Sequence, residues 1–241
     1  MKTLCGFIIF AMMVLLSVPL ALADAQQSII ELGDRDWQVR RSAAESLGAA
    51  RATDKEALAA LTSALRDPDS RVRRSAADAL GQIGDKANRS VPQLVAVFDD
   101  VDPSVVAAAA RATGKMGRRA SRAVEELTDL LDHEDARVRQ AASASLGNIG
   151  KRARESAHDL NARLGDKDPA VRAAAARALG QVDSSSDQVV SDLVRILDDE
   201  DRVLTITNNY ERISFNAGPT LAAWLSRHAY ATLGRMVEGD P

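Results

Sequence analysis

The sequence is poor in cysteine, histidine and aromatic residues. Its 241 residues include one cysteine, three histidines and only 3% aromatic side chains. Cys5 lies in an N-terminal segment that we expect to be removed, which excludes disulfides, thiolate catalysis and cysteine-ligated metals from the mature chain. His133, His158 and His228 show no metal-ligand spacing. The formal net charge of −3 is too small to steer the whole molecule towards nucleic acid or anionic lipid.

The most apolar segment lies at the N-terminus. Lys2 precedes an apolar run over residues 7–22, and Ala21-Leu22-Ala23 has the small-x-small pattern of a cleavage site. We therefore predict a signal peptide at 1–23, cleaved between Ala23 and Asp24, and an exported protein that is periplasmic or secreted. The alternative is an uncleaved membrane anchor, although the run is short for a span of about 20 residues. After cleavage we expect no stable membrane insertion.

An internal repeat dominates the rest of the chain. The stretch DPDSRVRRSAADALGQIG at 67–84 returns in close copies at 100–117, 133–150 and 166–183. Glycines recur every 33 residues at Gly48, Gly81, Gly114, Gly147 and Gly180. Valine, alanine, leucine and aspartate residues also recur every 33 residues, and we call each such set of equivalent positions a column. A fixed period of this length indicates a repeat architecture.

Each repeat is predicted to contain two helices. Residues 91–98 place apolar side chains in a helical stripe, and Asp69 and its counterparts are expected to cap the second helix. Gly84, Gly117 and Gly150 lie where a left-handed helix stop is expected. Gly81 lies inside the second helix, where glycine costs about 1 kcal/mol relative to alanine. Close approach of a neighbouring helix would compensate for that cost.

One helix pair cannot bury its own apolar faces, so neighbouring pairs must stack into a solenoid. The Asp-x-Asp-x-x-Val-Arg-x-x-Ala-Ala-x-Ala-Leu-Gly-x-Ile-Gly pattern of 67–84 resembles the short HEAT repeats of the phycobilisome-lyase-like type. The resemblance implies an all-α, right-handed α-solenoid with an armadillo-type fold. Six repeats fit residues 24–241: 24–50, 54–84, 87–117, 120–150, 153–183 and 186–241.

An arginine column recurs directly after the valine column, at Arg40, Arg73, Arg139 and Arg172. Our preferred interpretation is structural: each arginine pairs with an aspartate of the next repeat, from the column that contains Asp69 and Asp102. The alternative is a basic ladder that binds an acidic partner. Val106 occupies the arginine position of the third repeat.

The turns of the repeats differ in charge. Turns within repeats are acidic, as in residues 99–102, whereas the turns between the middle repeats are basic. The basic set, on which we place a candidate partner-binding edge, is Arg118, Arg119, Arg122, Lys151, Arg152 and Arg154. Compensation of helix dipoles explains part of this pattern, and docking of an acidic protein or a phosphate-bearing surface is the alternative.

The second helices offer another candidate surface, a shallow groove suited to a helix or extended segment of another protein. Small residues are expected to keep it flat: Ala77, Ala110, Ser143 and Ala176. Arg74 and Arg111 are the candidate contacts there.

The sixth repeat is interrupted by a 21-residue insert over residues 203–223. Alternating apolar residues around Asn208-Asn209 predict a β-hairpin. One interpretation makes the insert a C-terminal cap of the core. The other makes it a recognition loop, with contacts from Asn208, Asn209, Tyr210, Glu211, Arg212 and Phe215.

No grouping of residues predicts catalysis, a metal or a cofactor. A Ser-His-Asp set and a phosphate-cradling glycine loop are missing from the sequence. His133-Glu134 is a single pair in a turn, whereas deoxyhypusine hydroxylase, built of similar repeats, uses several such pairs in helices. We therefore predict a non-catalytic scaffold or adaptor that binds another protein and not nucleic acid. The alternatives are a lyase-type or deoxyhypusine-hydroxylase-like oxidoreductase subunit, and a structural module without a specific partner.

Overall fold

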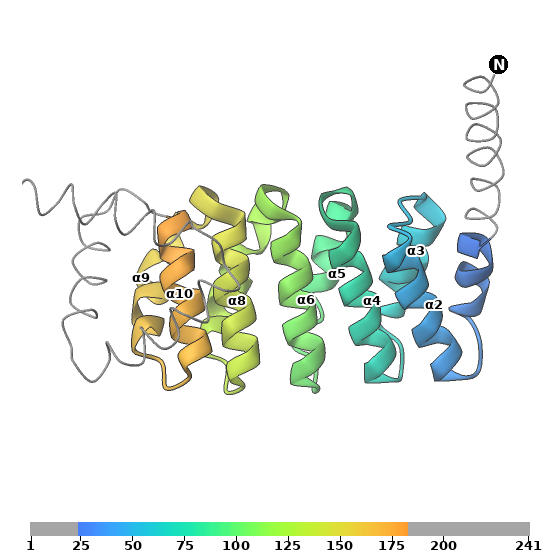
Figure 1. Cartoon of the computed structure of the whole chain (residues 1–241), viewed down its shortest axis with the longest axis horizontal. Coiled ribbons are helices and arrows are strands. Elements are labelled where there is room, and N and C mark those ends of the chain that lie inside the picture. Colours follow the sequence, from blue (N-terminus) through green and yellow to red (C-terminus); the bar gives the residue numbers. More distant parts are fainter. Residues whose placement is uncertain (1–23, 183–241) are drawn as a thin grey trace, which may run out of the picture. The chain divides into compact units, whose positions relative to one another are not determined.

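The computed structural model describes residues 24–182, and these residues form helices and turns without a strand (Figure 1). The chain divides into two compact units, residues 1–112 and 113–241. Each unit consists of paired helices, so the expected all-α fold of two-helix repeats is confirmed for the described residues. The predicted signal peptide, the sixth repeat and the insert lie outside them.

Unit 1 contains a first helix over residues 24–31 and four further α-helices. These are α2 (Trp37–Ala49), α3 (Lys55–Ala64), α4 (Ser70–Ile83) and α5 (Val91–Val95). A 3₁₀ helix, η1 (Gly84–Ser90), joins α4 to α5. The helix α6 (Pro103–Lys115) begins in this unit.

Unit 2 repeats the same arrangement with more 3₁₀ structure. Its elements in chain order are η2 (Gly117–Ala123), α7 (Val124–Asp129), η3 (Leu130–Asp132), α8 (Ala136–Ile149), η4 (Gly150–Ser156), α9 (Ala157–Ala162), η5 (Arg163–Gly165) and α10 (Pro169–Val182). The 3₁₀ segments between repeats were not predicted. The first helix of a pair is also shorter than its apolar stripe predicted; α5, for example, ends at Val95, whereas the stripe extends to residue 98.

Aspartate caps start the second helices, as predicted. The side chain of Asp69 accepts a hydrogen bond from the backbone N–H of Arg71, and Asp36 and Asp135 do the same two residues ahead. Gly84 and Gly150 end α4 and α8 with φ of 72° and 73°. Their ψ values of −133° and −144° differ from the left-handed stop that we expected. This region of the backbone map is open essentially to glycine alone.

Second helices of neighbouring repeats pack closely inside each unit, α2 against α4 and α8 against α10. Small side chains and leucines fill the contact, and Ala44, Leu47 and Leu80 are fully buried. A Cβ added to Gly48 would lie 2.7 Å from the Cα of Ala79. The glycine column inside the second helices is therefore explained by helix approach, as the sequence predicted.

Candidate interaction surfaces

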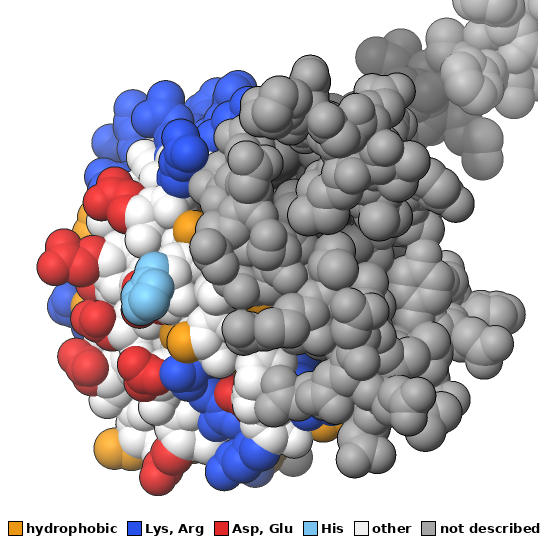
Figure 2. Space-filling model, turned by 90° about the vertical axis from the view of Figure 1, so that its left-hand side faces the viewer, with side chains coloured by type: hydrophobic (Ala, Val, Ile, Leu, Met, Phe, Trp, Pro, Cys, Tyr) orange, Lys and Arg blue, Asp and Glu red, His pale blue; other side chains and the backbone are white. Residues whose placement is uncertain are grey.

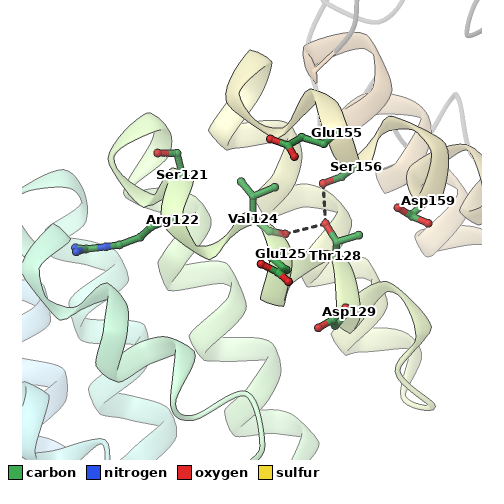
Figure 3. Close-up of a pocket in the computed structure, with 9 residues that line it drawn as sticks. All are labelled: Ser121, Arg122, Val124, Glu125, Thr128, Asp129, Glu155, Ser156 and Asp159. Carbon is green, nitrogen blue, oxygen red and sulfur yellow. Dashed lines mark hydrogen bonds between the residues drawn. The ribbon is translucent and has the colours of Figure 1, made fainter.

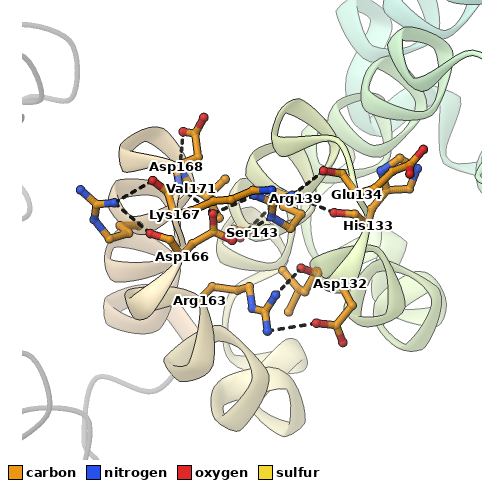
Figure 4. Close-up of polar contacts among 12 residues, drawn as sticks. Asp132, His133, Glu134, Arg139, Ser143, Arg163, Asp166, Lys167, Asp168 and Val171 are labelled. Atoms are coloured by element: carbon orange, nitrogen blue, oxygen red, sulfur yellow. Dashed lines mark hydrogen bonds and ion pairs between the residues drawn. The ribbon is translucent and has the colours of Figure 1, made fainter.

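The arginine column forms ion pairs that cross from one repeat to the next, and we call these pairs the arginine ladder. Arg40 binds Asp67 through Nε and Nη2 at 2.6 and 2.8 Å, and Arg73 binds Asp100 with the same distances. In unit 2, Arg139 binds Asp166 at 2.7 and 2.8 Å (Figure 4). The preference for a structural role is thus supported for these three arginines.

The predicted partner column was wrong. The carboxylates that pair with arginine lie two residues before the capping column that contains Asp69 and Asp102. A capping aspartate already accepts the backbone N–H groups at the start of its own helix, as Asp69 does from Arg71. The preceding aspartate is left to face the neighbouring repeat, and Asp67 also accepts the N–H of Asp69. Each arginine therefore meets the first aspartate of the next turn.

Each ladder arginine also donates hydrogen bonds to backbone carbonyls of the turn in its own repeat. Nη1 of Arg139 donates to the backbone carbonyls of His133 and Glu134, both at 2.8 Å. Arg172 of the arginine column, whose next repeat lies outside the described residues, donates to the carbonyls of Asp166 and Lys167 in the same way. The side chains of Arg139 and Asp166 are each only 5% exposed. The ladder consequently fixes the turn and the spacing between repeats at once.

The middle of the chain departs from the ladder at two sequence positions. Val106 holds the arginine position of the third repeat and is fully buried. His133 holds the aspartate position of the next turn, and its Nδ1 accepts the backbone N–H of Asp135 at 2.9 Å. His133 therefore keeps the turn-forming role of the aspartate that it replaces.

Two capping aspartates are held ionised by arginines. The Arg71 guanidinium lowers the pKa of Asp69 from 3.8 to about 2, chiefly through side-chain hydrogen bonds. Arg137 lowers the pKa of Asp135 to about 2 by the same interaction. Arg71 also lies 3.2 Å above the centroid of the Trp37 ring, a cation–π contact that the sequence analysis missed.

These pKa shifts predict loss of stability in acid. A carboxylate with a depressed folded-state pKa stabilises the fold fully above its unfolded pKa, and this contribution disappears as the pH falls through the folded pKa. We therefore expect the melting temperature to fall between pH 3.8 and about pH 2, followed by circular dichroism. The double variant Asp69→Asn/Asp135→Asn keeps capping side chains and should show a shallower fall. If the melting temperature fell equally steeply with pH in the wild type and in the double variant, the two capping aspartates would not be the cause of the acid sensitivity.

The surface of the second helices differs from the predicted one. Ala77, Ala110 and Ser143 are fully buried and do not form a flat outer face. Ala77 and Ser143 lie on helices that pack against both a first and a second helix of the same unit, α3 and α2 for α4, and α7 and α10 for α8. Arg74 and Arg111 are exposed as predicted, and Arg111 pairs with Asp78 at 3.5 Å.

The basic turns of unit 2 form one continuous surface. We call the six cations of η2 and η4 the basic edge: Arg118, Arg119, Arg122, Lys151, Arg152 and Arg154. All six are exposed, and the two turns contact each other. In Figure 2, Lys and Arg side chains gather at the upper margin of the described residues with Asp and Glu below them, and further Lys and Arg side chains lie towards the lower margin. The acidic turns lie at the opposite ends of the second helices, since α8 begins after Asp135 and ends at Gly150.

An acidic cavity of about 560 Å³ lies beside the basic edge in unit 2 (Figure 3). Its lining includes the carboxylates of Glu125, Asp129, Glu155 and Asp159. The hydroxyls of Thr128 in α7 and Ser156, the last residue of η4, form a hydrogen bond of 2.6 Å. The sequence analysis missed this cavity, although pairs of acidic residues four positions apart in successive repeats were a detectable signal.

The remaining candidates lie mostly outside the part of the chain that the structure describes. Asn208, Asn209, Tyr210, Glu211, Arg212 and Phe215 lie outside the described residues, as does His228. His158 is exposed, and no three metal-ligating side chains within residues 24–182 are placed to hold an ion. Across the same residues, the helices are too short or too polar to cross a membrane.

Comparison with known proteins gives a family and a fold. A family model of HEAT repeats matches residues 26–113, 91–157 and 124–207. No curated protein sequence matches the chain. The complex of CpcE and CpcF of phycocyanin lyase from Nostoc sp. PCC7120 is similar, with 27% identity and a TM-score of 0.60 over 72% of this chain and 70% of that chain.

Two other solved structures share the fold. Computationally designed armadillo repeat proteins for modular peptide recognition are 19% identical, with a TM-score of 0.54 over 83% of this chain and 96% of that chain. The karyopherin Kap121p, bound to the extreme C-terminus of the protein phosphatase Cdc14p, is 16% identical, with a TM-score of 0.60 over 85% of this chain and 24% of that chain. Together with the family match, these similarities identify the fold as an α-solenoid.

Proposed function

Since the chain belongs to the HEAT repeat family, we propose that it is a non-catalytic scaffold or adaptor that binds another protein. We further propose that it acts outside the cytoplasm, because residues 1–23 have the pattern of a cleaved signal peptide. The proposal covers residues 24–241 as one repeat domain.

One observation carries this proposal: the ladder arginines lie in largely buried ion pairs that serve the fold, whereas the cations of the basic edge are exposed and form an extended surface. The guanidinium of Arg139 is committed to Asp166 and to two backbone carbonyls. The exposed basic edge runs over two successive turns of unit 2. Rigid repeats with extended surfaces suit recognition of another protein. The designed armadillo proteins and the karyopherin complex give examples of this use on the same fold.

An enzymatic role as a lyase subunit is the second candidate. The similarity to CpcE and CpcF of phycocyanin lyase favours it. A lyase subunit must bind a tetrapyrrole or another small substrate. A scaffold needs no such ligand.

Purification from the native compartment separates the two candidates. We expect the tagged protein to retain a partner protein in stoichiometric amount and to carry no tetrapyrrole or iron. Absorption spectroscopy and mass spectrometry of the purified material provide the measurement. A bound chromophore without a partner protein would overturn the scaffold proposal. A deletion variant that lacks residues 203–223 tests the insert: if capture is lost at an unchanged melting temperature, the insert recognises the partner and is more than a cap.

A further inference from the structure

The basic edge carries more positive charge than the equivalent turn of unit 1. The turn η2 holds three arginines and no carboxylate, and η4 holds Lys151, Arg152 and Arg154 beside Glu155. The equivalent turn of unit 1, η1, holds Lys86 and Arg89 beside Asp85. Because η1 forms the same turn with fewer cations, the extra cations of η2 and η4 are not needed to form the turn.

Helix dipoles explain only part of the basic edge. Arg118 and Lys151 follow the ends of α6 and α8, where cations are favourable. Arg122 and Arg154 lie in the last turns of η2 and η4, where a cation is also favourable, and shortly before the first residues of α7 and α9, Val124 and Ala157. A cation before a helix N-terminus opposes the dipole of that helix. For these two arginines the dipoles of the 3₁₀ turn and of the following helix therefore act in opposite directions, and they do not explain the accumulation of cations.

The composition of the edge indicates the chemistry of its ligand. Five of its six cations are arginines, and the planar guanidinium binds carboxylate or phosphate oxygens in pairs. The alanines of these turns, Ala120, Ala123 and Ala153, are buried, so the edge offers no apolar side chain from them for insertion into a membrane. An anionic ligand held by charge fits this surface.

The shape of the charge distribution favours a narrow ligand. Arg122 lines the acidic cavity together with Glu125 and Glu155, and its side chain extends away from these two carboxylates (Figure 3), so the edge borders acidic surface. A broad anionic membrane laid on this edge would meet these carboxylates as well. An extended chain can follow η2 and η4, which contact each other, and avoid the cavity.

We propose that the basic edge binds an extended, acidic segment of a protein partner, rich in Asp and Glu. This inference rests on the proposed scaffold function and assigns the partner chemistry of one surface. The carboxylates of the segment would pair with the guanidinium groups of both turns. Binding would weaken as salt concentration rises, because exposed charges are screened.

The test uses the purified protein, a fluorescein-labelled oligoglutamate peptide, a Gly-Ser peptide of equal length, and phosphatidylglycerol vesicles. The variant Arg118→Glu/Arg152→Glu reverses one cation in each turn. The structure records no hydrogen bond or ion pair of either side chain within residues 24–182, so the fold should persist. Lys86→Glu/Arg89→Glu is the matched control, with the same change of net charge on η1.

We expect fluorescence anisotropy at physiological ionic strength to show binding of oligoglutamate but not of the Gly-Ser peptide. Arg118→Glu/Arg152→Glu should weaken binding at least about tenfold, and the control less than about threefold. Equal losses in both variants, no binding by the unmodified protein, or preference for the vesicles would overturn the proposal. If a native partner is retained equally by wild type and Arg118→Glu/Arg152→Glu, the scaffold function stands and this surface does not carry it.

Discussion

Replacing Arg139 by alanine is expected to lower the free energy of unfolding by about 3 kcal/mol. The substitution leaves the Asp166 carboxylate without its bidentate partner, in a site where that side chain is only 5% exposed. It also removes the hydrogen bonds to the carbonyls of His133 and Glu134. Chemical denaturation followed by circular dichroism measures the loss.

Arg137→Ala is the matched control. Arg137 also pairs with an aspartate, at 2.6 Å from Asp135, but its side chain is 66% exposed. Exposed ion pairs contribute little, so the control should lose no more than about 1 kcal/mol. The double variant Arg139→Met/Asp166→Leu should recover part of the loss, because it removes the buried charge together with its partner. Similar losses for Arg139→Ala and Arg137→Ala would show that burial does not strengthen the ladder.

Gly48→Ala is expected to destabilise the protein by about 2 kcal/mol, through overpacking against a neighbouring helix. The new Cβ would lie 2.7 and 2.8 Å from the Cα and Cβ of Ala79 in α4. Backbone at that distance cannot be displaced cheaply. Helix propensity alone predicts the opposite sign, a gain of about 1 kcal/mol. The sign of the measured change therefore decides between local propensity and tertiary contact.

Gly165→Ala provides the same chemical change without the contact. No atom lies within 4 Å of a Cβ added at Gly165. Its stability should stay unchanged or rise by up to about 1 kcal/mol. Both variants are compared by urea unfolding. A stabilised Gly48→Ala protein would refute the close approach of α2 and α4.

Local features of the fold followed from the sequence because they depend on neighbouring residues. The Asp69 cap was predicted from its place before a helix, and its carboxylate accepts the N–H of Arg71. The positive φ of Gly84 was predicted from its place at the helix end, but not the ψ of −133°. The requirement for glycine at position 48 was also predicted, since repetition inside a helix implies a close contact. Each case needed only the order of residues and the period of 33.

Contacts between repeats were predicted less well. The arginine column was expected to pair with aspartate in the next repeat, but two aspartate columns recur with the same period, two residues apart. Periodicity cannot distinguish Asp67 from Asp69 as the partner of Arg40. The structure distinguishes them because Asp69 is occupied by its own helix, whereas Asp67 lies 2.6 Å from Nε of Arg40.

The sequence by itself determined what recurs: paired helices, their caps, the glycine positions and the charge of the turns. Tertiary structure decided which side chains meet across repeats, including the ladder partner of Arg139, the burial of Ala77 and the gathering of Glu125 and Glu155 around one cavity. The physical reason is that a period specifies intervals along the chain. The direction in which a side chain points is set by the packing of neighbouring helices. The spacing of residues along the chain carries no information about that packing.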